Sequence, residues 1–327
     1  MAQQDVCRPT PRRVYDIADM SPHLATGSTH IGISGWRYQG WRGSFYPPGL
    51  PRRLELQHAS RIFNSIEING THYSLLRPSS FEQWRDATPD GFTFALKGSR
   101  FITHMLKLRG AEGALANFFA QGVLALGPKM GPILWQFAPR FAFDAERLST
   151  FFDLLPRTTT DVAALAHEHG PRLKGRAFTE ALVKQPVRHC IEIRHDSFVC
   201  PEFIALLRKH NIGLVVADTV EWPLLFDVTS DFVYCRLHGS EELYASGYGD
   251  AALDTWAKRV VRWAHGEEAE DETASSRLHG HHASPTPARK RQKRDVFVYF
   301  DNDAKVHAPY DAQALQRRVE KLHTAKK

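Results

Sequence analysis

The segment Val233-Tyr234-Cys235-Arg236-Leu237-His238 alternates apolar side chains with aromatic and polar ones. Successive side chains of a β-strand point to opposite faces, so Tyr234, Arg236 and His238 share one face and the apolar residues share the other. In a closed barrel of parallel strands, helices cover the outer face and side chains fill the interior. The segment therefore predicts a barrel strand whose polar residues turn inward.

Two other segments show the same alternation. Residues 66–69 read Ile-Glu-Ile-Asn, and residues 191–194 read Ile-Glu-Ile-Arg. The isoleucines suit a face covered by helices, which leaves the polar residues on the interior face. The residues predicted to face inward here are Glu67, Asn69, Glu192 and Arg194.

Short strand-like runs recur along the whole chain and are separated by amphipathic stretches, a pattern typical of parallel βαβ units. The predicted strands are residues 31–34, 65–69, 92–97, 133–137, 190–194, 214–218, 232–238 and 296–302. The predicted helices are residues 54–63, 114–126, 144–155, 201–210, 252–265 and 311–323. Eight such strands predict an α/β fold, a single (β/α)₈ TIM-type barrel, with a doubly wound open sheet as the alternative.

The boundaries of this barrel follow from composition. The chain has 327 residues, of which 43% are hydrophobic, enough for one large core. Residues 1–29 are predicted to be a disordered tail, and residues 30–325 the barrel. Residues 266–294 begin acidic, pass through Ser/His-rich sequence and end in a basic run, so they predict a low-complexity insertion that is dispensable for folding.

Charge and cysteine content restrict the cellular setting and the partners. The net charge is +6 and the four cysteines have no CxxC spacing, which favours a reducing compartment. No apolar run is long enough to span a bilayer, so we expect a soluble cytoplasmic protein without membrane association. The basic run at 289–294 would indicate nuclear import or nucleic-acid binding if it is exposed in a eukaryotic cell, although such runs are usually only solvated.

Signatures of common cofactors are missing. Gly32, Gly35 and Gly40 lack the spacing of a dinucleotide-binding loop, and no GxxxxGK[ST] motif occurs. No cofactor is therefore assigned. Suitable metal-ligand types are present but lie on different strands without diagnostic spacing, so no metal site is predicted. These residues are Glu67, Glu192, His195, Asp218 and His238.

The strand ends carry the candidate site. Catalytic groups of barrel enzymes come from the carboxyl ends of several strands, and most of the predicted strands end in polar residues. Glu67 or Glu192 would act as base and His238 as acid, in a hydrolase or transferase for a small anionic or phosphate-bearing substrate. The predicted substrate-binding residues are Ser34, Trp36, Asn69, Tyr73, Lys97, Gln136, Arg194, His195, Asp218, Arg236 and Asn302.

Structural roles for the same residues remain open. Glu67 with Arg194, and Glu192 with Lys97 or Arg236, would also suit ion pairs that fill the barrel centre. His238 would equally suit a buried hydrogen-bonding role, and the aromatic residues after the first two strands either stack on a ring or roof the pocket. These aromatic residues are Trp36, Tyr38, Trp41 and Tyr73.

Two alternative functions stay beside the enzyme hypothesis. A nucleic-acid-binding barrel would show a basic rim extended by residues 289–294 and an affinity that falls steeply with salt. A non-catalytic ligand-binding or scaffold protein would use the polar mouth without a reaction.

A resemblance to a known family rests on several of these segments together. They are residues 31–36, 45–47, 66–73, 94–100, 102–104, 134–137, 191–195, 234–239 and 299–302. Jointly they resemble the YecE-like family, or domain of unknown function 72, over residues 31–322. The resemblance implies a TIM-barrel fold and no established reaction, and similarity of such folds to DNA-binding barrel endonucleases is a likeness of fold alone. The chain differs from the family pattern at Gly70, at Asp301 and in the long insertion.

Overall fold

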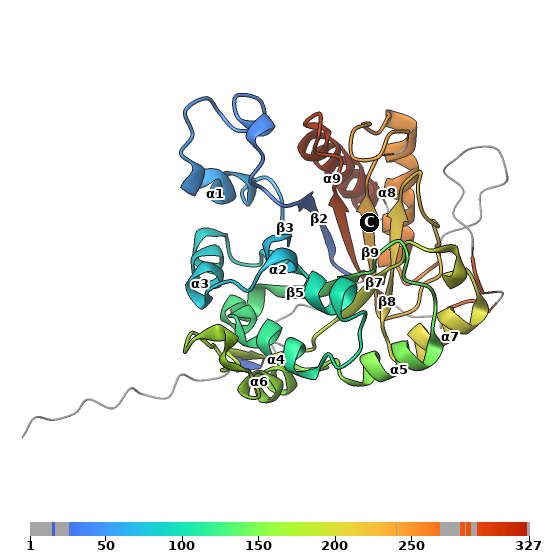
Figure 1. Ribbon diagram of the computed structural model, residues 1–327. Helices are drawn as coiled ribbons and strands as arrows, with labels where there is room; N and C mark the ends of the chain where they lie inside the picture. The colour runs from blue at the N-terminus through green and yellow to red at the C-terminus, as the bar shows by residue number, and fades with distance from the viewer. Residues whose placement is uncertain are drawn as a thin grey trace, which may run out of the picture.

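Eight parallel strands close into a barrel in the computed structural model, which describes residues 15–16, 26–239, 241–268, 282–284, 286–288 and 293–325. The barrel strands are β2 Thr29–Ser34, β3 Ser65–Ile68, β4 Thr93–Lys97, β5 Met130–Gln136, β7 His189–Glu192, β8 Gly213–Asp218, β9 Phe232–Leu237 and β10 Asp295–Phe300. Their order around the barrel follows the sequence, and β10 pairs with both β9 and β2 to close it. The predicted (β/α)₈ barrel is confirmed, with its strands at the centre of the molecule (Figure 1).

The alternation along each strand separates two apolar cores. On β9, Val233, Cys235 and Leu237 belong to the large core between strands and helices, whereas Tyr234 belongs to a smaller core inside the barrel. Other strands contribute Ala95, Leu134, Cys190, Val215, Phe297 and Tyr299 to this inner core. Because these side chains fill the barrel interior, the polar residues that face inward at the strand ends pack on top of an apolar core.

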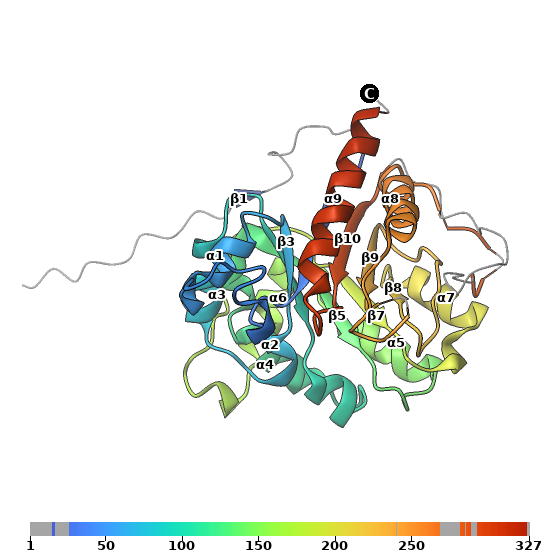
Figure 2. The ribbon, with the colours of Figure 1, turned by 90° about the horizontal axis from the view of Figure 1, so that it is seen from above.

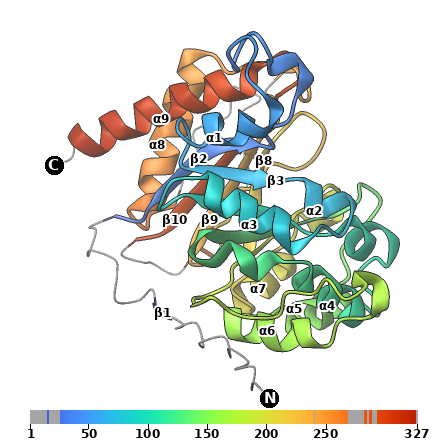
Figure 3. The same ribbon diagram turned by 90° about the vertical axis from the view of Figure 1, so that its left-hand side faces the viewer.

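Helices surround the barrel. They are α1 Glu55–Ala59, α2 Gly70–Tyr73, α3 Pro78–Ala87, α4 Glu112–Ala120, α5 Ala145–Asp153, α6 Thr159–His167, α7 Pro201–Lys209, α8 Asp250–Ala264 and α9 His307–Ala325. Short 3-10 helices are η2 Gln39–Trp41, η3 Arg52–Leu54, η5 Val123–Lys129, η6 Pro171–Leu173 and η7 Asp196–Phe198, and η4 Phe101–Met105 is a π-helical turn. Helix α9 runs beside β10 with α8 next to it (Figure 2), while α4 and α6 pack together at the other end of the side view (Figure 3).

The apolar stripe of α8 docks as its spacing predicts. Leu253, Trp256, Val260 and Trp263 are all buried. The helix predicted over 114–126 is instead broken at Gly122, whose φ of 126° ends α4 and starts η5. A Cβ at Gly122 would lie 2.6 Å from the Cα of Pro78, so the close approach to α3 requires glycine here.

Helices α2, α3 and α6 are not among the predicted helices, although the sequence before α6 carries a helix start signal. The side chain of Thr158 accepts a hydrogen bond from the backbone of Asp161, and the Asp161 side chain accepts one from Thr158 in return. This capping box satisfies two backbone N–H groups that a helix start leaves unpaired. The T-x-x-D spacing at residues 158–161 was therefore a usable signal for this helix.

The tail ends earlier than the predicted boundary at residue 29. Thr29 already belongs to β2, and the backbone N–H of Gly27 donates to the carbonyl of Ala264. Further upstream, β1 Tyr15–Asp16 pairs in parallel with β6 Val183–Lys184. The rest of residues 1–25 lies outside the described residues.

The borders of the predicted insertion pack on the barrel. Buried Asp227 accepts hydrogen bonds from the backbone N–H groups of Ala283 (2.7 Å) and Ser284 (3.2 Å). Arg294, the last residue of the basic run, is 2% exposed and donates to the carbonyl of Glu267, so it adds no charge to a surface patch. Residues 269–281, 285 and 289–292 lie outside the described residues. We therefore keep the expectation that the insertion is dispensable for folding only for residues 269–281.

Among the helices of the described residues, none is long and apolar enough to cross a membrane.

Replacing residues 269–281 by a Gly/Ser segment of equal length should leave the melting temperature within a few degrees of the wild-type value. The segment contains a single large apolar side chain, Leu278, so it offers little burial to offset the cost of ordering it. The comparison variant is Asp227→Ala, which removes the acceptor of two backbone N–H groups and should cost about 1–3 kcal/mol. A loss of melting temperature in the replacement as large as that in Asp227→Ala would contradict the expectation.

Candidate functional site

A single arginine occupies the centre of the polar cluster at the strand ends. Arg236 is completely buried, and its guanidinium forms ion pairs with Glu67 (3.0 Å), Glu192 (2.7 Å) and Asp301 (2.7 Å). Although burial alone would lower it, the three carboxylates raise the pKa of Arg236 well above its ordinary value. The guanidinium therefore remains charged and links strands β3, β7, β9 and the end of β10.

Both carboxylate oxygens of Glu67 are occupied. Oε1 accepts from Ser34 Oγ (2.5 Å) and from Arg236 Nη2, and Oε2 accepts from Tyr234 Oη (2.6 Å) and from Arg236 Nε (3.1 Å). Asn69, two residues later on the same face, donates from Nδ2 to Ser34 Oγ (3.1 Å). Glu67 thus lies in a saturated hydrogen-bond network, which leaves it no free lone pair directed at the mouth.

Glu192 is held in the same way from the other side of the barrel. Its Oε1 accepts from Gln136 (2.7 Å) and twice from Arg194, while its Oε2 faces Arg236. Burial favours the neutral acid, but Arg236 and then Arg194 outweigh it and hold the pKa of Glu192 well below its ordinary value. The carboxylate is therefore ionised and fully paired.

The observed pairing differs from the predicted one at Glu67, which pairs with Arg236 and not with Arg194. Glu192 pairs with Arg236, one of its two predicted partners, and also with Arg194. Arg194 follows Glu192 on the same face two residues later, so the pair forms within one strand end.

Asp301 is a site residue that the sequence-based set lacks. Besides its ion pair with Arg236, its Oδ2 lies 3.2 Å from Nδ1 of His238. Burial opposes ionisation, yet Arg236 and His238 lower the pKa of Asp301 strongly. The alternation Phe297, Tyr299, Asp301 on the inner face would have predicted this placement.

His238 faces inward as predicted but is completely buried. Its Nε2 lies 3.4 Å from Arg236 Nη1, and its ring contacts Trp222 and Tyr244 edge-on at 5.5 Å and 5.4 Å between centroids. The aromatic rings cover this imidazole, so neither ring nitrogen is presented to the open mouth.

Lys97 lies beside the network without joining it. Its side chain is 7% exposed, and within the described residues its ammonium makes no hydrogen bond and no ion pair. Burial first, and the charge of Arg236 second, lower the pKa of Lys97. The mouth thus contains a confined cation with three unused donors.

Three predicted site residues do not join the polar network at the mouth. Asp218 continues the outer face of β8 and lies against Tyr248 and Trp256. Its burial there raises the pKa of the carboxyl group. Asn302 is likewise on the outer face and donates to the carbonyl of Ser246 and to Asp311. The predicted shared pocket is therefore wrong for these two residues, because each stands one position out of phase with the inner face. The third, His195, accepts from the backbone N–H of Ser197 and caps η7.

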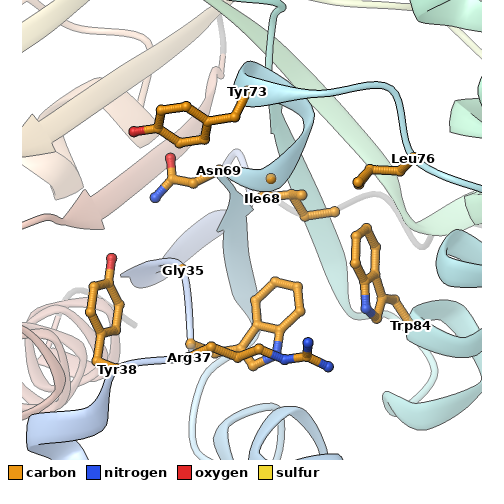
Figure 4. Close-up of a pocket in the computed structure, with 10 residues that line it drawn as sticks. Gly35, Arg37, Tyr38, Ile68, Asn69, Tyr73, Leu76 and Trp84 are labelled. Atoms are coloured by element: carbon orange, nitrogen blue, oxygen red, sulfur yellow. The ribbon is translucent and has the colours of Figure 1, made fainter.

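An open pocket of about 460 Å³ (Figure 4) adjoins the network through Asn69, which donates to Ser34 Oγ. Of the predicted residues, Trp36, Asn69 and Tyr73 line it. Tyr38 also lines it, and the sequence predicts that this residue either stacks on a ring or roofs the pocket. The lining residues without a sequence-based assignment are Gly35, Arg37, Ile68, Gly70, Leu76 and Trp84.

Comparison with known proteins assigns the family. A family model described as protein of unknown function DUF72 matches residues 30–327. The chain belongs to the DUF72 family. This DUF72 chain is 30% identical over 131 residues to the UPF0759 protein YecE of Escherichia coli K12, and the match covers 39% of this chain and 44% of that protein. The chain thus spans less than half the length of this curated relative.

Solved structures of the DUF72 family share the barrel. A DUF72 protein of Thermotoga maritima is 22% identical, with a TM-score of 0.67 over 90% of this chain and 99% of its own. A DUF72 protein of Enterococcus faecalis is 14% identical, with a TM-score of 0.61 over 89% and 95% of the two chains. At these identities the likeness establishes the fold alone.

Groups of three or more potential metal ligands are absent from the part of this DUF72 chain that the structure describes. Carboxylates at the mouth are instead neutralised by arginine.

Arg236→Met should destabilise the barrel by about 3–5 kcal/mol, because it leaves three buried carboxylates without their common partner. The free energy of unfolding in urea measures this effect. The matched control is Arg318→Met on α9, whose pairs with Asp250 and Asp254 lie at the surface and should contribute less than about 1 kcal/mol. Equal effects of the two substitutions would show that the central network is not the stabilising element.

Proposed function

We propose that this protein is an enzyme, a hydrolase or transferase, whose barrel mouth binds a small anionic substrate through Lys97. The observation that supports this most is the unpaired, buried ammonium of Lys97 at the carboxyl end of β4. A buried charge without a partner is unfavourable, and an anionic ligand would supply that partner. Barrel enzymes bind their substrates at this end of the strands.

Arg194 provides a second cationic contact. Its Nε and Nη2 donate to Glu192, while its Nη1 forms no hydrogen bond with the described residues. The guanidinium carbon lies 4.0 Å from the centroid of the Trp222 ring, a stacking contact that fixes its plane. One edge of the guanidinium is thereby available for an anion.

The positive charges are close enough together to affect a neighbouring histidine. Burial first, and then Arg100, Arg194 and Lys97, lower the pKa of His104. The three cations therefore lie within electrostatic range of one histidine. An anion bound near this histidine would be attracted by all three charges.

The central network would act as a frame in this proposal. Glu67 and Glu192 are saturated with hydrogen bonds, and His238 is covered by aromatic rings, so the geometry does not favour them as base and acid. Lys97 is the better candidate for a reactive group, because a lysine with a lowered pKa also serves as a general base or nucleophile. The network would then position Lys97 and set its charge.

Lys97→Met should abolish binding of inorganic phosphate without lowering stability. Phosphate that binds the folded state raises the melting temperature of the wild type by mass action, and the variant should lose this shift because it lacks the ammonium. The matched control is Lys258→Met on α8, an exposed lysine away from the mouth, which should keep the full shift. A wild type that shows no phosphate-dependent shift, or a Lys97→Met variant that retains it, would contradict the proposal.

The affinity for anions should decline with rising pH below the ordinary lysine range of about 10.4. The lowered pKa of Lys97 means that its ammonium loses its proton at a lower pH than an exposed lysine, and the neutral amine attracts an anion only weakly. Calorimetric titration with sulfate over a series of alkaline pH values measures this, because sulfate keeps its charge throughout. An affinity that remained constant up to the ordinary lysine range would argue against Lys97 as the contact.

A further inference from the structure

The pocket beside the charged mouth has aromatic walls. Trp36, Tyr38, Tyr73 and Trp84 line it, and Figure 4 shows Tyr38, Tyr73 and Trp84 on different sides of the open space. Its volume of about 460 Å³ lies in the range of pockets that hold small ligands, roughly 300–1,000 Å³. Flat side chains around a space of this size suit a planar ring.

Tyr73 has the exposure expected of a binding residue. Its side chain is 67% exposed. By contrast, Trp36 and Trp84 on the same pocket pack edge to face against each other, with ring centroids 5.3 Å apart. An aromatic ring that contributes so little to the core is available to contact a ligand, and its loss should not impair folding.

Polar groups accompany the aromatic walls. The Oδ1 atom of Asn69 is buried and has no hydrogen-bond partner within the described residues, whereas its Nδ2 is fixed by Ser34. An acceptor of this kind selects a ligand that carries an N–H or O–H group. Arg37, also on the pocket, is exposed and forms no ion pair in the described part of the chain.

The pocket and Lys97 are adjacent through the barrel register. Ile68 of β3 pairs with Leu96 of β4, so the next residues along the two strands, Asn69 and Lys97, are neighbours. The inner wall of the pocket therefore borders the proposed anion contact. A ligand with a ring at one end and an anionic group at the other could occupy both at once.

We infer that this pocket binds the planar aromatic ring of the substrate, so that the substrate class is an aromatic or heteroaromatic compound bearing a phosphate group. This inference rests on the proposed function for the phosphate contact at Lys97. The ring contact at Tyr73, Trp36 and Trp84 is a separate assignment, because it depends on shape and apolar surface rather than on charge.

Calorimetric titration of the full-length protein with phenyl phosphate, cyclohexyl phosphate and inorganic phosphate tests the inference. Phenyl phosphate should bind about ten-fold more tightly than inorganic phosphate, which is in the range of one base–aromatic stacking contact. Cyclohexyl phosphate, with a ring of similar size that is not planar, should gain less. Tyr73→Ala should remove most of the advantage of phenyl phosphate and leave the affinity for inorganic phosphate unchanged.

The control for this substitution is Tyr310→Ala on α9, a tyrosine that is 49% exposed and does not line the pocket. Equal affinities for phenyl phosphate and inorganic phosphate, with binding still dependent on Lys97, would overturn the ring assignment and leave the proposed function standing. Equal affinities for the phenyl and cyclohexyl esters would also overturn it. Binding of phenyl phosphate that depends on Tyr73 but survives Lys97→Met would support the ring pocket and refute the anion contact. Failure of all three phosphates to bind would overturn both.

Discussion

The ion-pair network around Arg236 is the constraint on which the barrel mouth depends. One buried guanidinium pairs with carboxylates from β3, β7 and the end of β10, and the two glutamates accept further hydrogen bonds. Ionised groups can remain buried only when such partners are present. The network therefore determines which polar side chains at the strand ends are used internally and which remain available.

A few polar groups at the strand ends remain available. Lys97 has no partner in the described residues, Arg194 has one unused edge, and Asn69 has an unused acceptor. Of these groups, Asn69 lines a pocket with aromatic walls. In the functional model proposed above, the saturated network acts as a rigid support, and the unsaturated rim next to it recognises the ligand.

Much of the fold was predictable because it follows from local patterns. The eight strands were found from apolar alternation, and the inward direction of Glu67, Glu192 and Arg236 followed from the same rule. Asp218 and Asn302 are the last polar residues of their strands, but each is one residue out of phase with the inner face, so their place at a strand end does not predict their direction. Asp301, in phase with Tyr299, was omitted from the site for the same reason.

The sequence by itself determined that eight barrel strands alternate with helices and which face most strand residues occupy, because alternation is a property of the extended backbone. Closure of the sheet into a barrel is seen only in the tertiary structure. Only the tertiary structure decided which cation forms ion pairs with the buried carboxylates. Arg236 and Glu67 are 169 residues apart in the chain yet hydrogen-bonded across the barrel. Their pairing, and the exclusion of Lys97 from it, depends on distances across the interior, which the strand register and the packing of the inner core set together.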